Sequence, residues 1–183
     1  MPSGLEEQLT TTDDNSTKPI GKGMFIIAWV IALGLLTWGF GNWEESQFNP
    51  NRKPQTSQTQ TFNEVILERN RFNHYVMNGQ INDTTVTFLL DTGATDVVIP
   101  EPIAKELGLK RGRQGLASTA NGVITVFSTN IDRLEIGEIT LRDVRASINP
   151  AMQSNDSILL GMSALKDVEF TQRGNELKIR QFR

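Results

Sequence analysis

The sequence contains no cysteine and a single histidine, His74. Without cysteine there is no disulfide, no thiolate nucleophile and no Cys-ligated zinc or iron–sulfur cluster. With one histidine, a multi-His metal site is excluded, and a Ser-His-Asp triad would have to be built on His74. His74 lies in a predicted strand, and we interpret it as a surface or packing residue. We therefore expect neither a metal nor a cofactor.

Positive charge is not in excess. The 183 residues contain 18 Lys and Arg against 21 Asp and Glu, which gives a net charge of −3. This balance is too acidic for a dedicated nucleic-acid binder, so no nucleic-acid partner is expected. Hydrophobic residues make up 38% of the chain, as in globular proteins. The length allows one ordinary domain plus an appendage.

One long apolar segment lacks charged residues altogether. It runs from Gly23 to Trp43 and ends in two of the three tryptophans of the protein, Trp38 and Trp43. At about 1.5 Å rise per residue it reaches roughly 30 Å, the hydrocarbon thickness of a bilayer. A buried core helix would have a polar stripe, and a signal peptide would be shorter and end in a small-x-small cleavage site. We interpret residues 23–43 as a retained single-pass transmembrane helix.

The segments around this span differ from it in composition. Residues 1–22 are polar and are expected to form a disordered cytoplasmic tail. Residues 44–61 are rich in Gln, Thr, Ser, Asn and Pro, which is typical of a flexible spacer. Lys18 and Lys22 precede the span and Glu44 and Glu45 follow it. The positive-inside rule then predicts a cytoplasmic N-terminus and a periplasmic or otherwise extracytoplasmic domain, held at the inner membrane.

The remaining residues, 62–183, contain short β-type runs separated by Gly and Asn turns. Strands are expected at 61–69, 72–77, 86–90 and 97–99 and throughout the second half of this region. The predicted turns are Asn78-Gly79, Asn121-Gly122, Gly137-Glu138 and Arg173-Gly174-Asn175. Residues 100–109 favour a short helix and 163–167 a single helical turn. We expect a mostly β domain with one definite short helix.

One motif in this domain carries chemistry. Asp91-Thr92-Gly93-Ala94-Thr95 directly follows the apolar run Phe88-Leu89-Leu90. An ionisable side chain thus follows a buried strand, and the small residues behind it are those that a tight loop needs. Taken alone, Asp91 is also compatible with an Asp that begins a turn and bonds its own backbone.

Three stretches in a fixed order resemble the retropepsin-like (clan AA) aspartic proteases. The first is Leu89-Leu90-Asp91-Thr92-Gly93-Ala94-Thr95, and the second is a hairpin over 115–127, where the family has its flap. The third is Ile158-Leu159-Leu160-Gly161-Met162, which is similar to the apolar pair plus Gly beside the catalytic loop. With the apolar span added, the chain resembles the bacterial membrane-anchored type. The resemblance implies a closed β-barrel of the acid-protease type after one transmembrane helix.

The resemblance also implies roles for individual residues and a homodimer. Two carboxyls that share one proton are needed, and the chain has one Asp-Thr-Gly, so each protomer would contribute Asp91. By the same resemblance, Thr92 would brace the loop across the dimer and Gly93 would contact the substrate backbone. The implied site residues are Asp91 as catalytic, Thr92, Gly93, Ala94 and Thr95 as loop support, Ser118, Thr119, Ala120, Asn121 and Gly122 as flap, and Leu159, Leu160 and Gly161 as the bracing motif.

The sequence therefore predicts a membrane-anchored homodimeric aspartic endopeptidase acting on proteins or peptides. Two other interpretations stay open: a catalytically silent domain of this fold that binds peptides or dimerises, and a small-molecule or lipid sensor. The intact Asp91-Thr92-Gly93 motif argues against a silent domain. The retroviral type interleaves its termini in the dimer, whereas residues 168–179 are predicted to form a self-contained hairpin.

Overall fold

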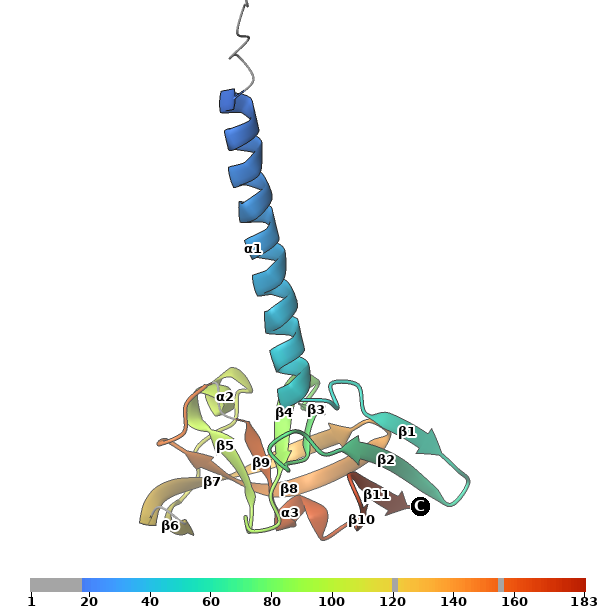
Figure 1. Cartoon of the computed structure of the whole chain (residues 1–183). Helices are drawn as coiled ribbons and strands as arrows, with labels where there is room; N and C mark the ends of the chain where they lie inside the picture. The colour runs from blue at the N-terminus through green and yellow to red at the C-terminus, as the bar shows by residue number, and fades with distance from the viewer. Residues whose placement is uncertain (1–17, 120–121, 155–156) are drawn as a thin grey trace, which may run out of the picture. The chain divides into compact units, whose positions relative to one another are not determined.

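A computed structural model describes residues 18–119, 122–154 and 157–183 (Figure 1). The chain divides into two compact units, residues 1–43 and 44–183. The helices are α1 (Lys18–Phe48), α2 (Glu101–Glu106) and α3 (Met162–Leu165). The strands are β1 (Gln55–Gln58), β2 (Phe62–Glu68), β3 (Val76–Ile81), β4 (Thr84–Leu90), β5 (Val97–Pro100), β6 (Gln114–Thr119), β7 (Gly122–Ile136), β8 (Ile139–Asn149), β9 (Ile158–Leu160), β10 (Glu169–Arg173) and β11 (Glu176–Phe182).

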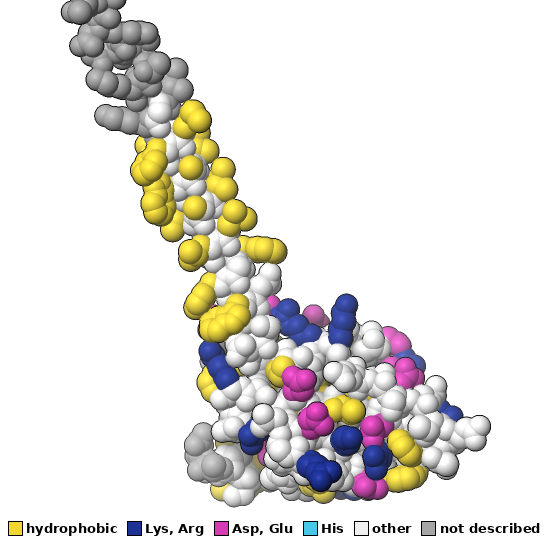
Figure 2. Space-filling model, turned by 45° about the vertical axis from the view of Figure 1, so that its right-hand side comes forward, with side chains coloured by type: hydrophobic (Ala, Val, Ile, Leu, Met, Phe, Trp, Pro, Cys, Tyr) yellow, Lys and Arg dark blue, Asp and Glu magenta, His cyan; other side chains and the backbone are white. Residues whose placement is uncertain are grey.

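Helix α1 is apolar around its circumference. Large side chains such as Phe25, Leu36 and Trp38 are exposed, which is expected of a helix that faces lipid rather than a protein core. Figure 2 shows hydrophobic side chains along the helix. The segment Gly23–Phe48 is long and apolar enough to cross a membrane, a criterion of length and composition that a signal sequence also meets. The helix extends beyond the expected 23–43 at both ends. Most of the expected disordered tail, residues 1–17, lies outside the described residues.

The prediction of a flexible spacer at residues 44–61 is wrong for much of this segment. Residues up to Phe48 continue α1, and β1 pairs antiparallel with β2. Asn51 lies in the segment between α1 and β1, and its side chain is buried. It donates hydrogen bonds to the carbonyls of Glu68 (2.9 Å) and Val76 (2.7 Å) and accepts one from the N–H of Glu68 (2.7 Å). A polar segment is ordered here because its hydrogen bonds are made to the domain instead of to water.

Six strands form a closed barrel, as the resemblance implied, and a seventh, β6, extends its sheet beside β7. The strand order is β3-β4-β9-β5-β8-β7-β6, and an additional pairing of β3 with β7 closes the ring. Side chains that alternate inward along these strands, such as Phe88, Ile99 and Ile148, are fully or almost fully buried. This packed interior supports the loop that follows β4.

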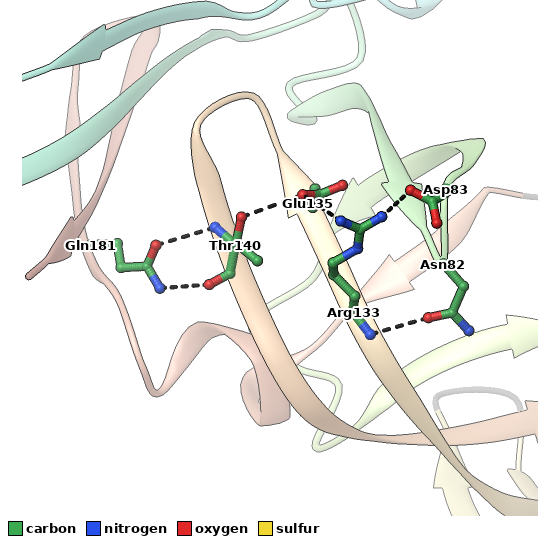
Figure 3. A network of polar contacts seen from close by, with 6 residues as sticks. All are labelled: Asn82, Asp83, Arg133, Glu135, Thr140 and Gln181. Atoms are coloured by element: carbon green, nitrogen blue, oxygen red, sulfur yellow. Dashed lines mark hydrogen bonds and ion pairs between the residues drawn. The ribbon is translucent and has the colours of Figure 1, made fainter.

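One predicted turn is wrong. Asn78-Gly79 lies inside β3, and the chain turns instead at Asn82 and Asp83, which both have positive φ (46° and 69°). Gly79 is required for close packing, because a Cβ there would overlap the carbonyl oxygen of Glu135 and the ring of Phe88. Arg133 holds the actual turn: its N–H donates to Oδ1 of Asn82 (3.1 Å), and its guanidinium pairs with Asp83 (Figure 3).

The other four strands form a second sheet, in the order β1-β2-β11-β10. The expected C-terminal hairpin is present as β10 and β11, but it is not self-contained, because β11 pairs along its whole length with β2. Gln181 of β11 joins this sheet to the barrel. Its amide donates to the carbonyl of Thr140 (2.7 Å) and accepts from the N–H of Thr140 (3.2 Å), as Figure 3 shows.

Two short helices cover parts of the barrel. Helix α2 lies within the predicted 100–109, and its first residue, Glu101, forms ion pairs with Lys105 and Arg111. A hydrogen bond from Lys105, and to a smaller extent one from Arg111, holds the pKa of Glu101 below its usual value. Helix α3 corresponds to the predicted helical turn and begins one residue earlier, with Gly161 between it and β9.

Candidate active site

Asp91 stands at the end of a buried strand. Strand β4 runs parallel to β9, with Phe88 opposite Ile158 and Leu90 opposite Leu160. The ladder ends at Asp91, whose N–H donates to the carbonyl of Leu160 (3.1 Å). An apolar strand pair therefore fixes the backbone at the carboxylate, and the side chain itself is only partly buried.

The residues after Asp91 form a tight loop around its carboxylate. The N–H of Gly93 donates to Oδ1 of Asp91 (2.9 Å), and the N–H of Ala94 donates to the carbonyl of Asp91 (3.2 Å). Thr92 and Gly93 are exposed. Among the residues that the structure describes, Oδ2 of Asp91 has no hydrogen-bond partner. One carboxylate oxygen is thus held by backbone, and the other is available to a ligand, a water or a second carboxyl.

Gly161 packs directly against this loop. A Cβ at Gly161 would overlap the carbonyl oxygens of Asp96 and Ala94, so the position has no room for a side chain. The residues that follow Gly161 form hydrogen bonds to the loop. The N–H of Met162 donates to the carbonyl of Ala94 (2.8 Å). Ser163 N–H likewise donates to the carbonyl of Thr95 (2.9 Å). The structure thus brings Leu160 and Gly161 of the predicted bracing motif against the loop, whereas Leu159 lies opposite Leu89 and Val98 in the sheet.

Three further contacts at this loop were not predicted. The buried hydroxyl of Ser163 accepts from the N–H of Val97 (2.9 Å) and donates to the carbonyl of Arg145 (2.6 Å), which ties β5 and β8 to α3. The guanidinium of Arg145 also pairs with Asp96 at 2.7 Å. Arg145 lies far from the motif in sequence, so no local pattern marks it. Ser163 could have been noticed as a polar residue in an otherwise apolar turn.

The predicted flap is a hairpin at the edge of the barrel sheet. Strands β6 and β7 pair up to Thr119 and Gly122, and the hydroxyl of Thr119 donates to the carbonyl of Gly122 (2.8 Å). Ser118 precedes them on β6, while Ala120 and Asn121 lie outside the described residues. Within the described part of the chain, β6 pairs with β7 alone and not with the strands that carry the Asp91 loop.

Within residues 18–119, 122–154 and 157–183, no group of three or more His, Cys, Asp or Glu side chains is placed to hold a metal ion. Within the described residues, the hydrogen-bond partners of Asp91 are backbone groups of Leu160, Gly93 and Ala94. Their arrangement is suited to orienting one carboxylate.

Comparison with known proteins places this site in a family. Residues 77–167 match the family model described as "gag-polyprotein putative aspartyl protease". The crystal structure of a retropepsin-like aspartic protease from Rickettsia conorii has a similar fold, with a TM-score of 0.57 and 23% sequence identity. The match covers 69% of this chain and 98% of that one.

Two curated relatives are uncharacterised proteins. One, from the cobV 5′ region of a Sinorhizobium species, is 29% identical over 146 residues, which are 78% of this chain and 62% of the relative. The other, from Rickettsia prowazekii, is 30% identical over 108 residues, which are 56% of this chain and 45% of the relative. The chain therefore spans less than two thirds of the length of either. Together, the closed barrel, the Asp91 loop braced by Gly161 and the matched family model show that this chain belongs to the retropepsin-like aspartic protease family.

Proposed function

We propose that this protein is a membrane-anchored aspartic endopeptidase that acts as a homodimer, with one Asp91 from each protomer. The observation that carries the proposal is the Asp91 loop. Its carboxylate stands at the end of a buried strand, with Oδ1 bonded to the N–H of Gly93 and Oδ2 left without a partner in the described part of the chain. A carboxylate held in this way is oriented for chemistry and is still accessible to water.

The proposed reaction is hydrolysis of a peptide bond by an activated water. Two facing carboxyls share one proton, because like charges this close cannot both ionise. The ionised Asp91 takes a proton from the water as its oxygen attacks the carbonyl carbon, and the protonated partner gives its proton to the carbonyl oxygen. The tetrahedral intermediate then breaks the C–N bond, and the leaving amine receives the proton from the carboxyl that took it from water.

The second carboxyl has to come from a second chain. The other aspartates are not followed by Thr-Gly, among them Asp13, Asp83, Asp132 and Asp156. A two-fold axis beside the loop would bring Asp91 to its symmetry mate and Thr92 to the opposite loop. Anchoring in a membrane favours this pairing, because it concentrates the chains in two dimensions.

We assign the β6–β7 hairpin to covering the substrate. Its described tip residues Ser118, Thr119 and Gly122 are exposed, and Leu116 and Val123 leave 75% and 67% of their surfaces exposed. Exposed apolar side chains on a hairpin are suited to closing over an extended peptide, which adds strand-type hydrogen bonds and excludes water. The sensor function is not favoured by any feature of the site.

The anchor is assigned to residues 23–43 at the inner membrane. Lys18 and Lys22 before the apolar segment and Glu44 and Glu45 after it support a cytoplasmic N-terminus. The protease domain, residues 62–183, would then lie on the periplasmic side, where its substrates would be proteins or peptides near the membrane surface.

Cleavage of a mixed peptide library by the full chain in detergent, from about pH 3 to 8, tests the proposal. We expect Asp91→Asn to lower cleavage by about 10²–10⁴-fold, because the dyad loses its shared proton and its base. Asp132→Asn, at an exposed carboxylate in the same barrel, is the matched control and should cleave as the wild type does. Equal cleavage by both variants contradicts the assignment of Asp91. No cleavage by a wild-type dimer favours the peptide-binding module.

A further inference from the structure

Strand β10 leaves one backbone edge of the second sheet unpaired. It is the last strand in the order β1-β2-β11-β10, and within the described residues it pairs with β11 alone (Figure 1). Each of its residues from Glu169 to Arg173 is exposed. An unpaired edge presents N–H and C=O groups that are ready to pair with another strand.

Hairpin geometry identifies which groups point outward. Residues Gly174 and Asn175 form a two-residue loop, with Gly174 at φ 62° and Arg173 opposite Glu176. A pair that closes such a loop is hydrogen-bonded, and hydrogen-bonded pairs alternate along an antiparallel ladder. The backbone groups of Glu169 and Thr171 therefore face β11, and those of Phe170 and Gln172 face the free side.

The sequence of β10, Glu-Phe-Thr-Gln-Arg, is complementary in charge to its own reverse. If two copies of β10 pair antiparallel with Thr171 opposite Thr171 of the partner subunit, Glu169 stands opposite Arg173 of the partner subunit. Phe170 then stands opposite Gln172 of the partner subunit, and both have outward backbone groups. The register thus satisfies the free hydrogen-bonding groups and forms two ion pairs at once. The charged pairs are of the closely spaced, non-hydrogen-bonded kind.

A partly exposed aromatic side chain marks the same edge. Phe170 pairs across the hairpin with the buried Ile179, yet 38% of its own surface is exposed. A neighbouring strand on the free side would cover it. The opposite edge of the sheet, β1, has the sequence Gln-Thr-Ser-Gln, which offers neither charge nor an apolar side chain to select a partner. The observations therefore favour β10 over β1.

We propose that β10 is the dimer interface and that it pairs antiparallel with β10 of a second copy about a two-fold axis at Thr171. The two four-stranded sheets then join into one continuous sheet of eight strands. The inference rests on the proposed function, which requires two copies of Asp91. Helix α3 links the interface to the site, because its first residues bond the Asp91 loop and its last residue precedes β10 by only a short connection.

Single-thiol cross-linking tests the register directly, because the chain has no cysteine of its own. Thr171→Cys would place two thiols opposite each other on the axis, in a pair close enough for a disulfide. The matched control is Ser57→Cys, at an exposed position on β1. Under mild oxidation of the full chain in detergent, we expect the Thr171→Cys variant to form disulfide-linked dimers at least about tenfold faster than this control.

Charge-reversal variants distinguish ion pairs between two protomers from ion pairs within one hairpin. Glu169→Lys and Arg173→Glu should each weaken dimerisation by about tenfold, because each puts like charges opposite one another twice per dimer. The double variant should recover the wild-type dimer, because both intermolecular pairs are again opposite in charge. Within one hairpin, Glu169 lies opposite Arg180 and Arg173 opposite Glu176, so a role confined to the hairpin would make the double variant the worst of the three.

The outcomes distinguish this inference from the proposed function. Slow cross-linking of the Thr171→Cys variant, or a double variant worse than both singles, overturns the β10 interface, and the proposed function stands if the wild type still cleaves peptides. Rapid cross-linking of Thr171→Cys, together with a wild-type chain that cleaves no peptide, supports the interface and overturns the proposed function.

Discussion

At the scale of single residues, the site depends on a position without a side chain as much as on its carboxylate. Gly161 lies where the loop carbonyls of Ala94 and Asp96 come closest to β9 and α3. Because this loop is bonded through its backbone to Met162 and Ser163, its oxygens are not free to move aside. The orientation of Asp91 is therefore tied to the absence of a Cβ at the junction of β9 and α3.

We expect Gly161→Ala to destabilise the protein by about 3 kcal/mol and to reduce activity, because inserting a methyl into a packed site forces the backbone apart. Gly115→Ala is the matched control, since a Cβ there meets no atom within 4 Å. It should change the stability by less than about 0.5 kcal/mol. Thermal or denaturant unfolding of both variants measures the difference, and equal stabilities would contradict the close packing at Gly161.

Which residues of the site could be predicted from the sequence depends on how far apart they lie in the chain. Asp91, Gly93, Leu160 and Gly161 could be named in advance because each belongs to a short contiguous motif. The contacts of Ser163 with Val97 and Arg145 could not, because they join three elements that meet only after the barrel has closed.

At the scale of elements, the segment before the barrel is the main difference from expectation. Its polar composition predicted a spacer, yet Asn51 is only 4% exposed and satisfies three backbone groups of β2 and β3. The composition of a segment indicates only its average preference for water. A single buried amide side chain can nevertheless hold the segment in place by forming hydrogen bonds to the backbone of neighbouring strands. The segment around Asn51 is therefore a structured part of the domain.

We expect Asn51→Ala to cost about 3 kcal/mol of stability, because it leaves buried backbone donors and acceptors without partners. Asn130→Ala, at an exposed position on β7, should cost less than about 0.5 kcal/mol. Unfolding by denaturant compares the two variants. Similar denaturation midpoints for the two variants would mean that the segment around Asn51 is only loosely attached to the domain.

At the scale of the whole molecule, one chain forms a complete four-stranded second sheet. Strands β1 and β2 come from before the barrel and β10 and β11 from after it, so the two ends of the domain are paired within one protomer. Termini already paired in this way are not available to interleave with those of a partner. The sheet still has free edges at β1 and β10 among the described residues, and the edge of β10 is the interface proposed above.

Co-expression of equal amounts of wild-type and Asp91→Asn chains tests whether the active unit contains two copies of the site. With random pairing, only about half of the wild-type chains have a wild-type partner, so activity per wild-type chain should fall to about half. The control adds Asp91→Asn protein after separate assembly of the wild type. Unchanged activity in the co-expressed sample would mean that each chain acts alone.

The sequence by itself determined the apolar segment, the mostly β domain and the position of Asp91 at the end of a buried strand. Each of these is encoded in neighbouring residues: an uncharged run, alternating side chains and a loop motif after an apolar strand. The tertiary structure alone decided that β3 runs through Asn78-Gly79, that Asn51 orders the expected spacer and that β11 pairs with β2. The physical reason is that close packing and the satisfaction of buried hydrogen bonds depend on partners that lie far apart in the chain.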